Sequence, residues 1–483
     1  MRWRYILHII GALIVCIGLC MLFPLGFSLY YWDTGLVPLL HSMAITVVIG
    51  VSLYISFKND NSKGFLSHRE GMVITALGWL AAGSFGALPF LLSGVFSSPV
   101  DCFFESFSGF TTTGASVLTD IESVPKGLLF WRSLTHWLGG MGIIVLSLAI
   151  LPFLGVGGMQ LYKAEVPGPV PDKLTPRIKD TAMLLWQVYL LFSLIEAVLL
   201  VFGGMSLFDA LCHTFGTMAT GGFSTKNASI AYYDSAYIQT VITIFMLIAG
   251  INFSLHFQLL RGKPLVMWRD AECRFFLGLF LIFGIVTTIS VYQDNYPSLG
   301  QAVQYASFQV ASILTTTGYV TADFELWPSL PQCILLLCMF IGGSAGSTGG
   351  GMKCMRIMLL LKHSYQEIIR IIHPRAVIRV KLGKRVVPTD VLSGIWGFFI
   401  LWLGLLFLST LLVAASGVDV VTSFASVLAC IGNIGPGIGA VGPTDNYAMI
   451  PAFAKWVLML CMLLGRLEIF TVIILFIPEF YRK

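Results

Sequence analysis

Charged side chains are scarce in this sequence. Asp, Glu, Lys and Arg make up 11% of its 483 residues, whereas soluble globular domains carry roughly 25%. Hydrophobic residues make up 57%, and apolar runs near or above the roughly 20 residues that cross a bilayer recur along the chain. This composition excludes a soluble protein and predicts an all-α polytopic membrane protein.

The chain also lacks the side-chain clusters that catalysis and metal binding require. Its ten Cys residues form no CxxC pair and have no His at metal-ligand spacing, so we expect them to pack as small apolar side chains. The sequence shows no nucleophile or acid/base constellation. We therefore expect no enzyme activity, no covalent cofactor and no nucleic-acid partner.

Ten apolar runs are long enough to be transmembrane helices. They cover residues 5–30, 37–57, 72–95, 131–154, 181–202, 237–260, 274–292, 330–361, 391–415 and 454–477. Placing both termini in the cytoplasm puts most of the 29 Lys and Arg residues on the inner side, as the positive-inside rule requires. We therefore expect ten spanning helices with both termini cytoplasmic.

Shorter apolar segments lie between these runs, and each ends in a turn rich in Thr or Gly. TTTG occurs twice, and MATGGF and GNIGPG align with it; the anchor glycines are Gly114, Gly221, Gly318 and Gly435. The segments before the anchors are too short to cross a bilayer and are predicted as half-helices; they cover residues 99–110, 207–218, 299–314 and 420–431. One copy alone would be read as a polar loop, but four copies at similar intervals favour a repeat of span, half-helix, turn and span.

Irregular backbone at membrane depth is tolerated only where it is buried in protein or lines a water-filled cavity. Four such turns around a pseudo-fourfold axis would present backbone carbonyl oxygens to a dehydrated cation, as in a K⁺ channel. The anchors carry no ring of Asp or Glu, which argues against a divalent-cation pore, and oxygen ligands without thiolates suit a hard monovalent ion.

The predicted span over residues 330–361 contains a glycine-rich stretch that cannot remain helical, since each Gly costs about 1 kcal/mol relative to Ala. A broken helix facing a pore predicts a movable gate. A phosphate-binding loop is the competing interpretation, but the stretch lacks the GKS or GKT ending. The predicted gate residues are Gly342, Gly343, Ser344, Ala345, Gly346, Ser347, Thr348, Gly349, Gly350, Gly351, Lys353 and Arg466.

Arg466 is an intramembrane cation, which is costly unless it faces an interior or aqueous path. We expect it to restrict the path below the turns; snorkelling, or pairing with an acidic residue of another helix, is the alternative. The single glycines Gly140, Gly250 and Gly465, in the helices that follow the turns, are assigned to close helix packing.

Four motifs carry a resemblance that extends over essentially the whole chain: FFESFSGFTTTGAS, WLGGMGIIVLSLAILPFLGVGGMQLY, FIGGSAGSTGGGMK and GRLEIFTVIILF. They resemble the Trk/Ktr/HKT superfamily of potassium transporters, most closely its bacterial TrkH/TrkG membrane subunits. The resemblance implies potassium uptake across the bacterial inner membrane by a homodimer. It also implies a cytosolic TrkA-type regulatory subunit that binds NAD or ATP, neither of which would bind this chain.

The resemblance further implies a selectivity filter that binds K⁺, with Gly rather than Ser at position 114 favouring K⁺ over Na⁺. The fourth copy lacks the Thr hydroxyls, which predicts weaker K⁺/Na⁺ discrimination. The filter residues carried over are Thr112, Thr113, Gly114, Ala219, Thr220, Gly221, Thr316, Thr317, Gly318, Asn433, Ile434 and Gly435.

The predicted division of the chain follows the repeats. Residues 1–71 hold two N-terminal spans, and the four pore repeats cover 72–180, 181–272, 273–390 and 391–483. The third repeat includes the gate and a basic segment from residue 362 to 390, which suits either anionic membrane lipids or the regulatory partner. A less selective K⁺/Na⁺ transporter and an ion-coupled transporter of an organic solute remain alternative functions.

Overall fold

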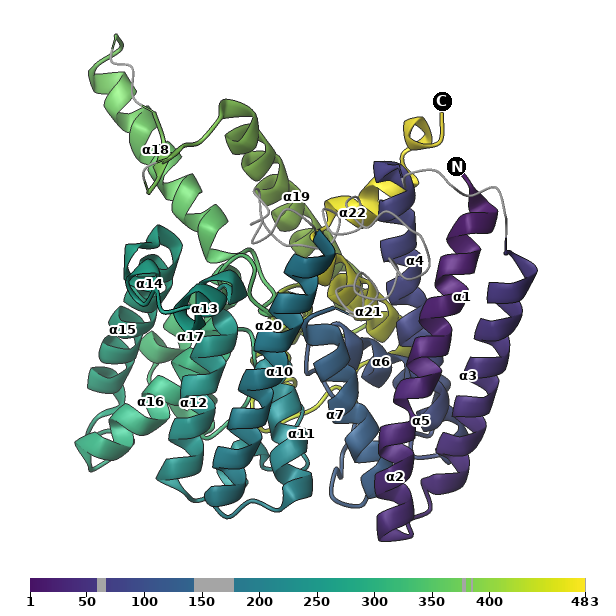
Figure 1. Ribbon diagram of the computed structural model, residues 1–483. Coiled ribbons are helices and arrows are strands. Elements are labelled where there is room, and N and C mark those ends of the chain that lie inside the picture. The colour runs from purple at the N-terminus through teal and green to yellow at the C-terminus, as the bar shows by residue number, and fades with distance from the viewer. Residues whose placement is uncertain (59–66, 143–177, 376–378, 384, 483) are drawn as a thin grey trace.

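The computed structural model describes residues 1–58, 67–142, 178–375, 379–383 and 385–482. Within these ranges the chain is helical apart from irregular loops and one antiparallel pair of short strands, β1 (Lys381–Leu382) and β2 (Arg385–Val386). The amino and carboxyl termini lie at the same end of the molecule (Figure 1). The predicted all-α class is confirmed for the described residues.

Six helices or continuous helix pairs in the described residues are long and apolar enough to cross a membrane. They are Trp3–Tyr31, which joins α1 (Trp3–Cys20) and α2 (Leu22–Tyr31); α3 (Leu36–Ser56); Arg69–Ser93, which joins α4 (His68–Gly86) and α5 (Leu88–Ser93); Ala182–Phe202 within α10 (Ile178–Phe202); α15 (Ala271–Val291); and α19 (Thr389–Ala414). Each coincides closely with a predicted run.

Two further predicted spans are sharply bent, so a straight helix over residues 237–260 or 454–477 is wrong. Helix α12 (Ala236–Gly250) turns by 104° into α13 (Phe253–Leu260). Helix α21 (Ala452–Arg466) turns by 110° into the segment Phe470–Phe476, which begins with α22 (Phe470–Ile473). Gly250 and Gly465, assigned from the sequence to packing alone, therefore also mark the ends of helices.

The predicted run over residues 330–361 is interrupted, as expected from its glycines. It forms α17 (Ser329–Ile341), an irregular loop, and α18 (Cys354–Ile372). Helix α7 (Lys126–Gly140) covers the start of the predicted span 131–154, and residues 143–154 lie outside the described ranges. With six to eight candidate spans in the described residues, the expectation of ten is not confirmed.

Four short helices have the bounds that the sequence predicts: α6 (Pro99–Phe110), α11 (Leu207–Met218), α16 (Leu299–Leu314) and α20 (Val420–Ile431). Three of them begin with a side-chain cap, in which Ser98, Ser206 and Asp419 accept a bond from a first-turn N–H at 3.3, 3.1 and 3.0 Å. Such caps satisfy donors that the helix itself cannot pair. The carboxyl-terminal halves of all four helices are buried, so the chain delivers each following turn into the interior.

The N-terminal helices pack through glycine. A Cβ built on Gly50 of α3 would lie 2.8 Å from the backbone nitrogen of Val15 in α1, and one on Gly11 would lie 2.6 Å from the nitrogen of Tyr54. Small residues at such crossings let two backbones approach closely inside a membrane. Helix α1 also packs on α4, which joins this pair to the rest of the molecule.

We predict that Gly50→Ala lowers the midpoint of thermal unfolding in detergent, because the added methyl group must push α1 away from α3, at a cost of about 1–3 kcal/mol. Gly404→Ala in α19 is the matched control, since a Cβ there meets no atom within 4 Å and Ala favours a helix over Gly by about 1 kcal/mol. A midpoint for Gly50→Ala at or above that of the unchanged protein would contradict this packing.

Candidate ion pathway

Each of the four short helices ends in the same backbone turn. We name these turn 1 (residues 111–114), turn 2 (219–222), turn 3 (315–318) and turn 4 (432–435). In every turn the third residue donates its N–H to the carbonyl five residues earlier, inside the preceding helix. These bonds are Thr113 to Ser108 (2.9 Å), Gly221 to Gly216 (2.8 Å), Thr317 to Ser312 (2.8 Å) and Ile434 to Ala429 (2.9 Å).

The backbone dihedrals repeat in the same way. The second and fourth residues of every turn have positive φ: Thr112 (54°) and Gly114 (79°), Thr220 (54°) and Gly222 (80°), Thr316 (61°) and Gly318 (83°), and Asn433 (53°) and Gly435 (96°). This conformation is uncommon for residues with a side chain. Its occurrence in all four turns shows that they share one fold.

These dihedrals correct the alignment of the second copy by one residue. Gly222, and not Gly221, stands where Gly114 stands in turn 1. The set Ala219, Thr220 and Gly221 carried over from the sequence is therefore out of register with the other three sets, and the matching residues are Thr220, Gly221 and Gly222. Ala219 instead caps the end of α11.

The four turns meet in a closed ring. The fourth-position glycine of each turn lies against the third carbonyl oxygen of the next turn, so close that an added Cβ would collide with it. A Cβ on Gly114 would lie 2.0 Å from the oxygen of Gly221, one on Gly222 2.1 Å from that of Thr317, one on Gly318 1.9 Å from that of Ile434, and one on Gly435 2.7 Å from that of Thr113. The order 1, 2, 3, 4 and back to 1 brings together segments from the whole length of the chain.

The carbonyl oxygens of this ring lie among buried residues and accept almost no hydrogen bonds. In the described part of the chain, the second, third and fourth residues of the turns accept a single hydrogen bond at their carbonyl oxygens, from the Tyr447 hydroxyl to Gly435 (2.7 Å). The side chains of Thr112, Thr316 and Asn433 are fully buried. Buried carbonyl groups ordinarily have a partner, so this ring can offer oxygen ligands to a cation.

Thr hydroxyls brace two of the turns. Thr111 bonds to Thr113 in turn 1, and Thr315 bonds to Thr317 in turn 3, both at 2.8 Å between hydroxyl oxygens. The Thr111 and Thr315 hydroxyls also donate to carbonyls one helical turn earlier, at 2.6 and 2.7 Å. The two TTTG copies are thus alike in side-chain bonding as well as in sequence.

Turn 4 is built differently. Asn433 donates from Nδ2 to the Thr113 hydroxyl and to the Met462 carbonyl, both at 3.0 Å. Its amide therefore ties turn 4 to turn 1 and to α21. Tyr447 also donates to the Gly435 carbonyl. This carbonyl therefore already has a hydrogen-bond donor, whereas within the described residues the carbonyls at the fourth position of the other three turns accept no such bond.

A buried ion pair supports turn 1 from beside it. Arg132 Nε donates to Glu105 Oε1 at 2.6 Å, and both side chains are buried. Glu105 also accepts from the Ser116 hydroxyl and the Val117 N–H, both at 2.9 Å, while Arg132 reaches the Ser224 carbonyl at 2.9 Å. Buried charges of this kind require pairing. The pair joins the irregular segments that follow turns 1 and 2.

The glycine-rich loop lies against the ends of three of the four short helices. Thr348 donates its hydroxyl to the carbonyl of Met218, the last residue of α11, at 3.0 Å. The Gly350 N–H donates to the Thr316 hydroxyl at 2.7 Å, and a Cβ on Gly350 would lie 2.5 Å from the carbonyl oxygen of Gly432. The loop therefore packs at the ends of α11, α16 and α20.

Both ends of the loop are held by neighbouring helices. Glu272 Oε1 in α15 accepts from the N–H groups of Ala345 at 2.7 Å and Met355 at 3.0 Å. The Ser344 N–H donates to the carbonyl of Gly250, where α12 ends, at 2.9 Å. Lys353 is buried and its ammonium group donates to the Gly349 carbonyl. Apart from Arg466, the predicted gate residues thus lie in one segment from 342 to 353, which is buried except at Gly346.

Arg466 joins this loop to the end of α7. Its guanidinium donates to the carbonyls of Thr348 at 2.8 Å and Gly140 at 2.8 Å, and also to that of Gly139. Glu468, the nearby acid, pairs instead with Arg356 of α18. Arg466 is therefore turned inward on backbone oxygens, and its role in an ion path stays a prediction.

Three supporting residues were not found from the sequence. Glu105 and Glu272 are lone acids near apolar helices, a pattern that does not name their partners, and Tyr447 lies in an irregular segment. What distinguishes these residues is their burial, which only the folded structure shows. The described residues contain no group of three or more His, Cys, Asp or Glu that could hold a metal ion.

Known proteins are similar to this chain over nearly its whole length. Residues 38–482 match the family model described as TrkH, a cation transport protein. The chain is 46% identical over 490 aligned positions to "Trk system potassium uptake protein TrkH" of Escherichia coli (strain K12), covering 100% of both chains. It is 37% identical to "Trk system potassium uptake protein TrkG" of the same organism, covering 99% of each.

A solved structure is similar over the whole length. The crystal structure of the potassium transporter TrkH from Vibrio parahaemolyticus superposes with a TM-score of 0.90, at 39% identity, and each chain is covered completely. The family model and these relatives span both the turns and the glycine-rich loop. The chain is therefore a member of the TrkH family of cation transport proteins.

Proposed function

We propose that this protein carries K⁺ into the bacterial cell across the inner membrane, and that the ring of turns 1 to 4 is its selectivity filter. The closed ring of carbonyl oxygens is the observation that carries this proposal. Oxygen ligands of this kind replace the hydration shell of a weakly held monovalent cation. The names of the relatives, which are potassium uptake proteins of the Trk system, support the same ion.

The corrected filter residues in this proposal are the second, third and fourth residues of each turn. They are Thr112, Thr113, Gly114, Thr220, Gly221, Gly222, Thr316, Thr317, Gly318, Asn433, Ile434 and Gly435. The negative ends of α6, α11, α16 and α20 all precede the ring, which favours a cation there.

The loop from Gly342 to Gly351 acts as the gate in this proposal. Its buried position at the ends of three short helices would obstruct an ion leaving the ring, and its glycines allow it to change shape. Arg466 adds a positive charge below the ring and holds Thr348. Three neighbouring helices could move the loop. Helix α18 is bonded to it through Cys354, helix α15 through Glu272 and helix α21 through Arg466.

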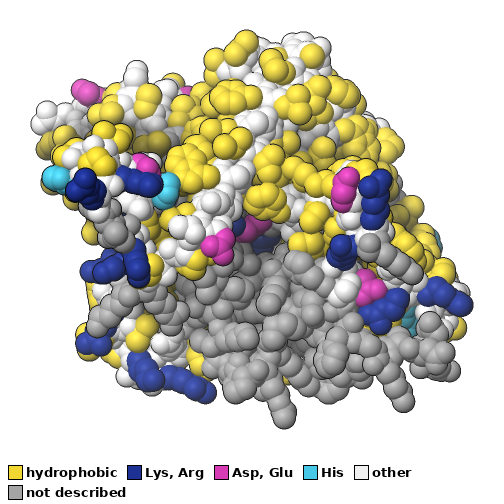
Figure 2. All heavy atoms as spheres, turned by 90° about the horizontal axis from the view of Figure 1, so that it is seen from above, with side chains coloured by type: hydrophobic (Ala, Val, Ile, Leu, Met, Phe, Trp, Pro, Cys, Tyr) yellow, Lys and Arg dark blue, Asp and Glu magenta, His cyan; other side chains and the backbone are white. Residues whose placement is uncertain are grey.

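The proposal includes a second copy of the chain and a cytosolic partner. Beyond the first turns of α18, Tyr365, Ile368, Ile371 and Ile372 expose most of their apolar surface, and this helix projects from the body (Figure 1). Such a stripe favours a homodimer. Figure 2, which looks onto the end that carries both termini, shows Lys and Arg side chains at both sides of this face.

We assign this face to the cytoplasm, in keeping with the positive-inside rule. A nucleotide-binding subunit of the TrkA type, with NAD or ATP bound to it, would then act on the basic segment from residue 362 to 390, which directly follows the gate and the first turns of α18.

A less selective K⁺/Na⁺ pathway is the second candidate, and turn 4 is the observation that favours it. Turn 4 has no Thr at its second or third position, where each of the other turns has at least one, and Tyr447 donates to the Gly435 carbonyl. Both features make the fourth quadrant unequal to the others, and selectivity depends on the number and strength of the coordinating dipoles.

We predict that Gly114→Ser lowers K⁺ flux into proteoliposomes by at least about tenfold, equivalent to about 1.4 kcal/mol of added barrier. The new side chain would collide with the Gly221 carbonyl, and the φ of 79° is strained for Ser. Gly94→Ser is the matched control, because Gly94 has a φ of 68° but no atom within 4 Å of an added Cβ. Unchanged flux and unchanged K⁺/Na⁺ preference in Gly114→Ser would remove the filter assignment.

We predict that Arg466→Ala raises Rb⁺ flux in the absence of any regulator by at least about tenfold, since it removes a positive charge from the path and releases Thr348 from its anchor. Arg261→Ala, in the exposed segment after α13, changes charge equally and should leave flux unaltered. Tracer uptake into proteoliposomes measures both variants. Equal flux in Arg466→Ala and the unchanged protein would exclude the pore role of this side chain.

A further inference from the structure

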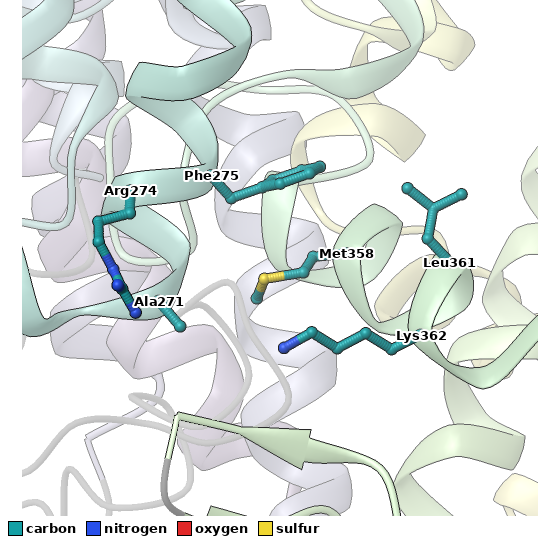
Figure 3. Close-up of a pocket in the computed structure, with 6 residues that line it drawn as sticks. All are labelled: Ala271, Arg274, Phe275, Met358, Leu361 and Lys362. Carbon is teal, nitrogen blue, oxygen red and sulfur yellow. The ribbon is translucent and has the colours of Figure 1, made fainter. Parts of the chain in front are cut away.

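A cavity of about 380 Å³ opens between the first turns of α15 and the middle of α18, away from the ring of turns. Its lining combines two cations with apolar surface: Ala271, Arg274, Phe275, Met358, Leu361 and Lys362. In Figure 3 the Lys362 ammonium group points from α18 towards Ala271, on the side of the cavity where the Arg274 guanidinium lies. Phe275, Met358 and Leu361 form the apolar part.

The two cations have no acidic partner in the described part of the chain. Arg274 Nε donates to the Asp270 carbonyl at 3.4 Å, and Lys362 Nζ donates to the Lys381 carbonyl at 3.0 Å. The nearby carboxylates are engaged elsewhere, because Asp270 caps α15 and Glu272 holds the glycine-rich loop. Like charges that share a cavity repel each other, so this cavity has the electrostatic character of an anion site.

An exposed apolar stripe leads away from the cavity along α15. Leu281, Ile282, Ile285 and Ile289 each expose more than half of their surface, and they follow Arg274 at helical spacing on one face. Such a stripe on a spanning helix faces lipid chains. Arg274 thus stands where the lipid-facing surface of α15 ends.

A membrane-interface marker lies at the same level. Helix α14 (Leu265–Arg269) precedes α15 directly, and its Leu265 and Trp268 are largely exposed. Exposed Trp is typical of the zone where lipid headgroups meet the hydrocarbon. The cavity therefore lies at the depth of phosphate groups, with hydrocarbon on its α15 side.

We propose that this cavity binds an anionic phospholipid, with the headgroup phosphate between Arg274 and Lys362 and one acyl chain along the exposed stripe of α15. Basic pockets between helices at the cytoplasmic surface suit such headgroups. The bound lipid bridges α15, whose Glu272 holds the glycine-rich loop, to α18, which begins directly after that loop. This inference stands on the cavity and the stripe, and it does not depend on which ion the protein carries.

Native mass spectrometry of the full-length protein tests the site with phosphatidylglycerol and phosphatidylcholine as probes. We expect phosphatidylglycerol to remain bound to the unchanged protein and to bind about thirtyfold more weakly to Arg274→Gln/Lys362→Gln, as the loss of two cations from an anionic site predicts. Lys362→Arg keeps the charge and should retain the lipid. Arg261→Gln/Lys263→Gln removes two exposed cations elsewhere and should also retain it.

Four results would overturn the proposal. The first is that the Arg274→Gln/Lys362→Gln variant retains as much phosphatidylglycerol as the unchanged protein does. The second is that the unchanged protein retains as much phosphatidylcholine as phosphatidylglycerol. Competition by inorganic phosphate at the same concentration as the lipid would identify a free-anion site instead. A change in oligomeric state of the double variant with no change in lipid retention would show that a second copy covers this face. Thermal unfolding in detergent micelles verifies that every variant is folded.

Discussion

The contact between a glycine and the carbonyl oxygen of the next turn is the constraint on which the rest of this structure depends. It occurs four times in cyclic order, and three of the four glycines could not gain a Cβ without placing it about 2 Å from that oxygen. Because the contact closes a ring, the four short helices must end at one level and converge on one centre. Their caps, their buried carboxyl-terminal halves and the Glu105–Arg132 pair all serve that geometry.

The glycine-rich loop connects this ring to the parts of the molecule that a signal could move. It bonds to Thr316 of turn 3 and to the end of α11 on one side, and to Glu272, Arg466 and the start of α18 on the other. Irregular backbone that is held at a few anchor points can adopt a second arrangement when one of those anchors shifts. The break in α12 after Gly250 belongs to the same assembly, because its carbonyl accepts from Ser344.

The sequence was sufficient to predict the short helices, six of the spans and the position of the loop, because apolar length and glycine content act locally. It could not give the register of turn 2, since ATGG offers adjacent glycines and only the fold shows that Gly222 takes the positive φ. The bends after Gly250 and Arg466 were missed because a helix ends there through contacts with distant segments. Glu272 was missed for the same reason, because its partner Ala345 lies far along the chain. Tyr447 was missed because it lies in an irregular segment whose path back to Gly435 has no local sequence signal.

Anomalous diffraction from crystals grown in Rb⁺ tests most directly whether four unequal turns form one cation site. The account predicts a Rb⁺ peak at the centre of the ring, enclosed by carbonyl oxygens from all four turns, with the ligands of turn 4 longer than those of turns 1 to 3 because Tyr447 competes for Gly435. A peak bound by side-chain carboxylates elsewhere, or no peak within the ring at saturating Rb⁺, would contradict it.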